Sequence, residues 1–248
     1  MDRLICPGER LDSLQCRGLV ILQQPGGFRF GMDAVLLAHF ATARPGMQAA
    51  DLGTGTGVIP LLLAAHTRIA HIDGLEIQPG MADMARRSVM LNGLEERIRI
   101  LCGDLRECPL PKDGYDLVLA NPPYLRLHAG EQSALETVRI ARQEACCTLK
   151  QIIACAAGLL HSKGRLAMVY RPERLAELLS EMRAYQLEPK RVQLVLPRAE
   201  CAPNLALVEA VKCGGPDARW LPPLVVYGPD GRYTERILNL YNGEGYHG

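Results

Sequence analysis

Apolar and polar positions follow a regular order through the middle of the chain. Short apolar runs, each followed by a segment with helical spacing, repeat from residue 48 to residue 185. They predict strands over 48–51, 72–77, 97–101, 115–120 and 164–170, and helices over 58–67, 79–93, 148–161 and 172–185. This alternation indicates an α/β fold with a parallel sheet and right-handed crossovers.

Both ends of the chain depart from this alternation. Residues 9–24 alternate polar and apolar positions around glycines, which predicts a β-hairpin. Residues 192–196 and 205–211 read as two consecutive strands, so we expect an antiparallel edge strand that closes the sheet. The expected core is a mostly parallel seven-stranded sheet with helices on both faces.

Three parts of the chain follow from these elements. We expect an N-terminal hairpin extension over residues 1–30, a main domain over 31–213 and a tail over 214–248 packed on that domain. The main domain opens with a helix over 34–43, for which Asp33 is the predicted N-cap. The tail is rich in Gly, Pro and Tyr, with one helix expected near 234–241.

Composition narrows the class of protein. The formal net charge is +1, so the global charge does not predict a nucleic-acid binder, and any polyanion site must arise from local clustering. No apolar stretch approaches the ~20 residues that span a bilayer, and no signal peptide is recognised. Nine cysteines without a C-x-x-C pair predict reduced thiols and no metal site. We expect a cytoplasmic protein with no membrane partner.

A glycine-rich loop follows the first sheet strand. In Asp51-Leu52-Gly53-Thr54-Gly55-Thr56-Gly57 the glycines alternate, whereas a dinucleotide loop has the spacing G-x-G-x-x-G. Asp51 would repel a pyrophosphate but would suit a ligand that carries a positive charge. S-adenosylmethionine has both a sulfonium and an amino group, so this loop favours it over a nicotinamide dinucleotide.

Carboxylates also end the next two strands. Glu76 is placed to accept the ribose hydroxyls of a nucleotide, and Asp104 to accept the adenine amino group. Phe30 and Asp33, ahead of the sheet, and Leu105 are further predicted cofactor contacts. A nicotinamide-dependent dehydrogenase remains the main rival for these residues.

The tetrapeptide Asn121-Pro122-Pro123-Tyr124 follows the strand 115–120. Proline cannot donate a ladder hydrogen bond and restricts the residue before it, so the strand must end here in a stiff turn. The turn holds an amide and an aromatic ring at the carboxyl end of a strand, where ligands of open α/β sheets bind. An amide beside a flat ring suits a planar, nitrogen-bearing substrate.

The chain resembles Rossmann-like class I S-adenosylmethionine-dependent methyltransferases, and more closely the bacterial adenine-N6 methyltransferases that modify valine tRNA next to its anticodon. The resemblance covers nearly the whole chain. Besides the glycine loop and the tetrapeptide, it rests on residues 10–12, 28–30, 33–37, 141–144, 171–175 and 207–210. Gln143 departs from the Ala-Arg-His-Glu pattern of the family, which leaves a role for that side chain in doubt.

The resemblance implies roles for individual residues. Asn121 and the Pro122 carbonyl would accept hydrogen bonds from the adenine N6 amine, and Tyr124 would stack on the base. These three residues are the predicted catalytic group, and Asn121 also borders the cofactor. If RNA is the substrate, its phosphates need basic contacts, and the candidates are Arg126, Arg142, Lys190 and Arg191.

Other methyltransferase substrates remain open. Enzymes that methylate release-factor glutamines carry the same tetrapeptide, but they also carry a separate helical N-terminal domain. Only about 48 residues precede the first sheet strand here, and they include a predicted hairpin. Guanine-N2 methylation of ribosomal RNA is a second alternative. A module that binds S-adenosylmethionine without catalysis would leave the tetrapeptide without a purpose.

Overall fold

A computed structural model describes residues 4–24, 31–122 and 147–241. Its centre is a nine-stranded sheet. Seven strands form the continuous core, in the spatial order β5 (Ile98–Cys102), β4 (His71–Glu76), β3 (Gln48–Leu52), β6 (Tyr115–Ala120), β7 (Leu160–Tyr170), β9 (Leu205–Lys212) and β8 (Leu187–Leu196). The strands from β5 to β7 are mutually parallel, as predicted.

The two consecutive strands form the expected antiparallel pair, β8 with β9, but the strand that runs against the rest of the sheet is β9 and not the edge strand. β9 pairs antiparallel with both β7 and β8 and is therefore internal. Its residues are buried almost throughout, whereas β8 alternates between buried and half-buried positions, as a strand nearer the edge does. Two short strands of the tail, β10 (Arg219–Trp220) and β11 (Leu224–Val225), pair parallel with β8 and raise the total to nine.

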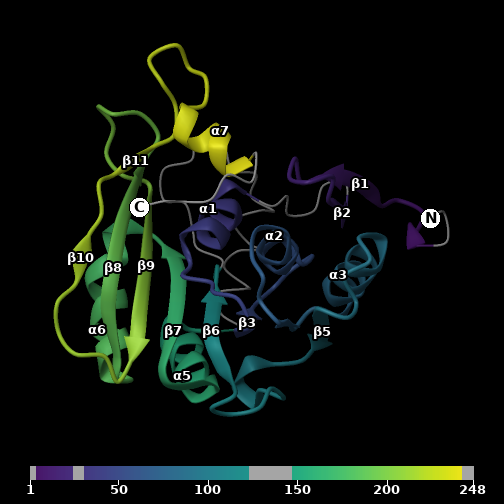
Figure 1. Ribbon diagram of the computed structural model, residues 1–248, viewed down its shortest axis with the longest axis horizontal. Coiled ribbons are helices and arrows are strands. Elements are labelled where there is room, and N and C mark those ends of the chain that lie inside the picture. Colours follow the sequence, from purple (N-terminus) through teal and green to yellow (C-terminus); the bar gives the residue numbers. More distant parts are fainter. Residues whose placement is uncertain (1–3, 25–30, 123–146, 242–248) are drawn as a thin grey trace.

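Helices cover both faces of the sheet, as expected (Figure 1). α1 (Met32–Phe40), α2 (Val58–His66) and α3 (Pro79–Leu91) share one hydrophobic cluster, and α5 (Leu149–Leu159) and α6 (Leu175–Ala184) share the other. β6 shows why both clusters form: Leu117 and Leu119 belong to the first, while Val118 and Ala120 belong to the second. Successive side chains of a strand point to opposite faces, so this apolar run is buried on both.

The predicted N-terminal hairpin is present. β1 (Arg10–Ser13) and β2 (Val20–Gln23) pair antiparallel, and β2 lies against α3. The backbone N–H of Leu22 donates to the Ser88 hydroxyl at 3.0 Å, and the Asn92 side chain exchanges hydrogen bonds with the backbone of Val20. Backbone groups of Val20 and Leu22 are thereby satisfied by side chains of α3 and its C-cap.

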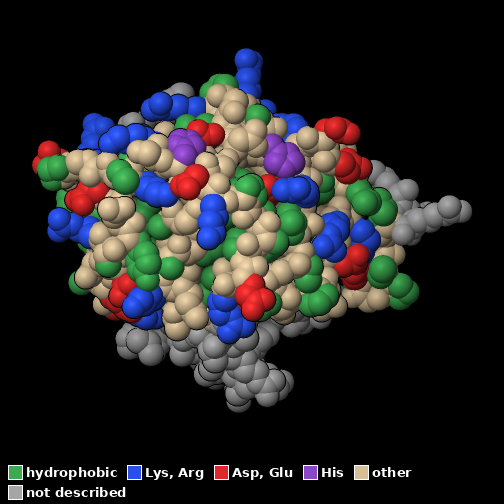
Figure 2. All heavy atoms as spheres, turned by 90° about the horizontal axis from the view of Figure 1, so that it is seen from below, with side chains coloured by type: hydrophobic (Ala, Val, Ile, Leu, Met, Phe, Trp, Pro, Cys, Tyr) green, Lys and Arg blue, Asp and Glu red, His purple; other side chains and the backbone are tan. Residues whose placement is uncertain are grey.

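At the other end of the chain, α7 (Glu235–Tyr241) packs against α1, beside the carboxyl ends of the parallel strands (Figure 1). Figure 2 shows the opposite side, where the parallel strands begin. Lys and Arg side chains are interspersed there with Asp and Glu, so the described surface of that side offers no extended basic area. None of the described helices has the length and apolar character needed to cross a membrane.

Two local predictions need correction. α1 begins at Met32 with Gly31 as its N-cap, so Asp33 lies inside the first turn and does not cap the helix. Its Oδ1 accepts a hydrogen bond from the adjacent Ala34 N–H, and the side chain is buried. β7 begins at Leu160, four residues earlier than the apolar run suggested, because an irregularity in its pairing with β6 accommodates a polar stretch within the strand.

Candidate active site

The carboxyl edge of the sheet brings the three predicted carboxylates onto neighbouring strands. Asp51 on β3 lies opposite Gly74 on β4, and Glu76 at the end of β4 lies opposite Cys102 on β5. Asp104 follows two residues after β5. Because β3, β4 and β5 are parallel neighbours, their carboxyl ends meet at one edge.

The glycine loop is folded back onto β4. The N–H groups of Gly53 and Thr54 both donate to the Leu75 carbonyl, at 2.8 and 3.0 Å. Gly53 and Gly55 have φ of +74° and +59°, a left-handed backbone conformation that residues other than glycine rarely adopt. A Cβ placed on either would meet no protein atom within 4 Å, so open space lies directly above both backbones. The loop is therefore built as a cradle that a ligand can approach closely.

Asp51 is the most unusual group at this edge. Its side chain has no exposed surface, and neither carboxylate oxygen has a hydrogen-bond partner among the described residues. The Thr54 hydroxyl, which lies close enough to influence the Asp51 carboxyl, is also buried without a well-aligned partner. Burial raises the pKa of Asp51 to about 7; the Thr54 hydroxyl opposes this increase, and the nearby charge of Glu76 adds to it. Unsatisfied buried polar groups of this kind indicate a ligand position.

Glu76 fixes the loop while keeping room to accept further hydrogen bonds. Its Oε2 accepts from the Gly55 N–H and its Oε1 from the Gln78 N–H, both at 2.9 Å. Each carboxylate oxygen can accept a second bond, so Glu76 can still bind a pair of hydroxyls as predicted. Asp104 is instead engaged with Arg106, which holds the pKa of its carboxyl below the ordinary value. An adenine amino group would have to share this carboxylate with Arg106.

A cavity of about 70 Å³ connects the glycine loop to the tetrapeptide. It is lined by the loop residues 53–56, by Val58 and Ile59 at the start of α2, by Ala34 and Met81, and by Asn121. Asn121 follows directly after β6, which is paired with β3, so its amide lies beside the loop. The predicted cofactor loop and the predicted catalytic amide thus share one cavity.

Some predicted contacts lie elsewhere. Leu105 lines a separate hollow of about 440 Å³, together with Cys108 and Cys155, between the short 3-10 helix Leu105–Glu107 and α5. Phe30, Tyr124, Arg126 and Arg142 lie outside the described residues. Pro122 is described and buried directly after Asn121.

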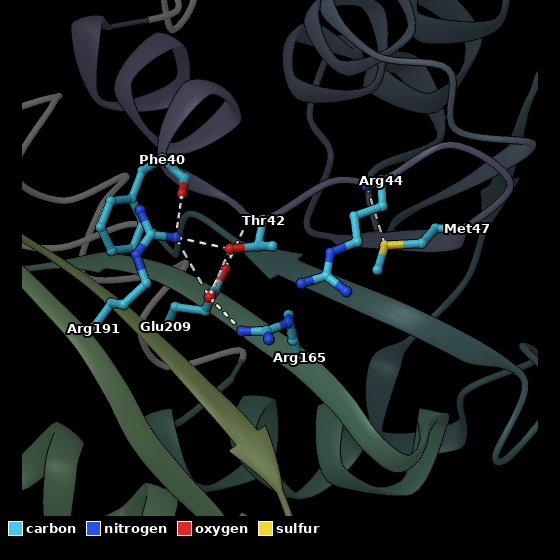
Figure 3. Close-up of polar contacts among 7 residues, drawn as sticks. All are labelled: Phe40, Thr42, Arg44, Met47, Arg165, Arg191 and Glu209. Atoms are coloured by element: carbon cyan, nitrogen blue, oxygen red, sulfur yellow. Dashed lines mark hydrogen bonds and ion pairs between the residues drawn. The ribbon is translucent and has the colours of Figure 1, made fainter. Parts of the chain in front are cut away.

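The two described residues assigned to RNA phosphates are engaged within the protein. Lys190 donates to the backbone carbonyls of Pro216 and Asp217 in the tail. Arg191 donates to the Phe40 carbonyl at 3.1 Å and the Thr42 hydroxyl at 2.8 Å, and its guanidinium stacks on the Phe40 ring (Figure 3). These contacts position the tail and α1, and they leave the phosphate role of both residues a prediction without structural support.

Sequence reasoning missed several cavity residues. Thr54 and Thr56 stand between the glycines, and their position in the loop could have identified them. Ala34 and Met81 come from α1 and α3, and nothing in the local sequence distinguishes them from ordinary helix residues. Within the described residues no cluster of three or more His, Cys, Asp or Glu side chains could hold a metal ion.

Comparison with known proteins agrees with this geometry. The family model described as methyltransferase small domain matches residues 31–186, which is more than half of the chain. The chain belongs to the methyltransferase small domain family. Membership confirms the predicted enzyme class, a methyltransferase that uses S-adenosylmethionine.

Relatives in this family share most of the chain. A Porphyromonas gingivalis protein named tRNA1(Val) (adenine(37)-N6)-methyltransferase is 34% identical over 224 residues, 86% of each chain. A Tolumonas auensis protein of the same name is 30% identical, over 73% of this chain and 75% of that protein. A crystal structure of a predicted O-methyltransferase, protein Atu636 from Agrobacterium tumefaciens, aligns with a TM-score of 0.72 at 25% identity, over 87% of this chain and 98% of that one.

The residues of this methyltransferase fit S-adenosylmethionine. The unsatisfied Asp51 carboxylate suits its amino group, the open cradle above Gly53 and Gly55 admits its body, and Glu76 retains acceptors for its ribose. The Rossmann-like expectation is confirmed by the parallel order β5-β4-β3-β6-β7 and by the matching family.

Proposed function

We propose that this methyltransferase transfers a methyl group from S-adenosylmethionine to the exocyclic N6 of an adenine in RNA, and that its substrate is a valine tRNA methylated next to the anticodon. The observation that carries the proposal is the cavity shared by the glycine loop and Asn121. The tRNA and the base follow from relatives that carry this activity in their names and share 86% of the chain.

The protein supplies positioning and electrostatics in this reaction. An adenine N6 amine is a weak nucleophile because its lone pair is delocalised into the ring. Hydrogen bonds from N6–H to the Asn121 side-chain oxygen and to the Pro122 carbonyl would localise this pair and stabilise the positive charge that develops on nitrogen. The bound cofactor supplies an electrophilic methyl group. Tyr124, which follows in the sequence, is assigned to stack on the base.

The rigidity of this segment supports the proposed role. Asn121 extends directly from β6, whose final residues Leu117 to Ala120 are fully buried between the two layers of helices. Pro122 is itself buried, and its ring fixes φ immediately after the amide. An acceptor held on a buried strand reaches a near-attack geometry at little entropic cost.

The proposal is tested with purified protein and labelled S-adenosylmethionine. Total tRNA, ribosomal RNA and release factor are offered in separate reactions, and labelled RNA is digested for nucleoside analysis. N6-methyladenosine in tRNA is expected. Label confined to release factor would instead assign glutamine methylation, and N2-methylguanosine in ribosomal RNA would assign the other alternative.

Asn121 can be tested separately from cofactor binding. Asn121→Ala removes the acceptor but leaves Asp51, the glycine loop and Glu76 in place, so methyl transfer should fall about 100-fold or more while the Kd for S-adenosylmethionine changes less than about threefold. Met81→Leu keeps the apolar lining of the same cavity and serves as the matched control, with near wild-type kcat. Wild-type turnover in Asn121→Ala would remove the role assigned to this amide.

A further inference from the structure

Several of the exposed apolar side chains come from the C-terminal part of the sequence. Of the seven large apolar side chains exposed among the described residues, four lie between Trp220 and Leu238, and three of these are aromatic. Tyr227 and Tyr233 are 36% and 38% exposed. An exposed tyrosine ring offers an apolar face together with a polar hydroxyl, and both can contact a partner.

Three tyrosines of this region form a continuous stack, which we call the tyrosine ladder: Tyr227, Tyr233 and Tyr241. The ring centroids of Tyr227 and Tyr233 are 5.2 Å apart with an interplanar angle of 20°, and those of Tyr233 and Tyr241 are 5.9 Å apart at 17°. The backbones of Tyr227 and Tyr233 form an antiparallel bridge, which fixes their spacing. The outer face of the Tyr227 ring therefore ends a rigid, nearly parallel stack.

The surroundings of the ladder suit a nucleic-acid strand. Arg232, in the turn between the two outer tyrosines, has a side chain that is 88% exposed. Its guanidinium is 4.0 Å from Asp230, itself 62% exposed, so the ion pair is loose and solvated. Aromatic rings that stack on bases, together with an arginine that contacts phosphate, are the combination by which proteins bind single-stranded RNA.

The inner end of the ladder lies on the helix that packs against α1. Tyr241 ends α7, whose Ile237 and Leu240 are buried in the same hydrophobic cluster as α1. α7 packs against α1, and burial raises the pKa of Tyr241 to about 12. Ala34 of α1 lines the cavity that holds Asn121. The ladder thus runs from the surface towards the place where the acceptor base must enter.

We propose that the tyrosine ladder is a stacking surface for unpaired nucleobases of the RNA substrate, with Tyr227 receiving a base that flanks the methylated adenine. This inference rests on the proposed function, because it takes RNA as the substrate. Unstacked bases of an RNA loop expose the flat faces that such a surface binds. The partner is thus a single-stranded RNA segment, which the ladder holds while the target base occupies the Asn121 cavity.

Tyr227→Ala tests the ladder, and Tyr227→Phe is the conservative variant that keeps the ring. Stacking of one base on an aromatic ring is lost only in the alanine variant, so we expect its KM for tRNA to rise about tenfold, with the KM for S-adenosylmethionine and the melting temperature close to wild type. Tyr227→Phe should retain the wild-type KM for tRNA. Trp220→Ala removes a more exposed aromatic ring, 59% exposed on β10 and outside the tyrosine ladder, and should leave all parameters unchanged.

Direct binding separates this inference from the proposed function. Fluorescence anisotropy with a labelled seven-nucleotide single-stranded RNA should show weaker binding by Tyr227→Ala than by wild type or Trp220→Ala. Equal binding and an equal KM for tRNA in Tyr227→Ala would overturn the ladder even if wild-type protein methylates tRNA. Ring-dependent RNA binding without methylation of any RNA would instead overturn the proposed function and leave the ladder standing.

Discussion

At the scale of single residues, Asp51 destabilises the folded protein without ligand but favours binding of a positively charged ligand group. Its carboxylate is wholly buried and has no hydrogen-bond partner among the described residues, so its ionised form is disfavoured and its pKa rises to about 7. A positively charged ligand group beside it would restore the ordinary preference for ionisation. Affinity for the cofactor should therefore depend on the protonation state of this one residue.

Asp51→Asn replaces the carboxylate with a neutral group of the same shape. The Kd of the wild-type protein for S-adenosylmethionine should rise as pH falls below about 7, by up to about tenfold per pH unit, because protonation removes the charge that attracts the ligand. The variant should bind about tenfold more weakly at pH 8 and show a flat profile, as measured by titration calorimetry between pH 6 and 8.5.

The same substitution should stabilise the protein without ligand. Above pH 7 the wild-type chain holds a buried negative charge that the variant lacks, so the variant should unfold at a higher temperature at pH 8. Asp116→Asn, near the start of β6, is the control. It should not raise the unfolding temperature, because the Asp116 carboxyl has a lowered pKa and protein partners that stabilise its charge. A pH-independent Kd in the wild-type protein would contradict the role of Asp51.

At the scale of elements, the local pattern predicted the order of strands and helices and the three carboxylates at one edge. It could do so because glycines, prolines and polar residues beside each apolar run mark where a strand or helix ends. The placement of β9 between β7 and β8 depends on pairing over a long sequence distance, for which no adjacent residue carries a signal. Arg191 shows the same limit: its basic neighbourhood suggested RNA, but its partners Phe40 and Thr42 are about 150 residues away.

Glu209 is the centre of the contacts that hold Arg191 (Figure 3). Its carboxylate, fully buried on β9, lies 2.8 Å from Arg165 of β7 and 3.4 Å from Arg191 of β8, and accepts hydrogen bonds from the N–H and hydroxyl of Thr42. Thr42 follows α1, so one side chain joins three strands to the end of the helix that lines the cofactor cavity.

Glu209→Ala should destabilise the protein by about 3 kcal/mol, because it leaves two partly buried guanidinium groups without their common partner. Denaturant unfolding measures this loss. Glu177→Ala, which breaks the exposed pair between Glu177 of α6 and the preceding Arg174, is the matched control. It should lower the free energy of unfolding by less than about 1 kcal/mol. Equal losses in the two variants would show that the Glu209 contacts carry no particular weight.

At the scale of the whole molecule, a partly buried cluster joins both ends of the chain to the central domain. The thiol of Cys16, in the N-terminal hairpin, is 3.5 Å from Nε2 of His66 on α2, and the His66 ring is 3.9 Å from that of His39 on α1. His39 in turn contacts the backbone of Leu240 on α7. Because burial and neighbouring positive charge disfavour the protonated imidazoles, the cluster is most stable while both histidines are neutral.

Acid should therefore loosen the attachment of both extensions at once. Burial lowers the pKa of His39 from 6.5 to about 3 and that of His66 from 6.5 to about 4, so between these values the unfolded chain binds more protons than the folded one. The contribution of the pair is fully present above about pH 6.5 and declines as pH falls, by up to about 2.7 kcal/mol per pH unit for two groups.

A double variant, His39→Gln with His66→Gln, cannot titrate here. Its free energy of unfolding relative to wild type should therefore rise steadily from pH 6.5 to 4.5 in denaturant titrations. His161→Gln is the control with the opposite sign, because Asp116 raises the pKa of that exposed histidine. A constant difference between wild type and the double variant over this range would show that the cluster does not carry the acid sensitivity.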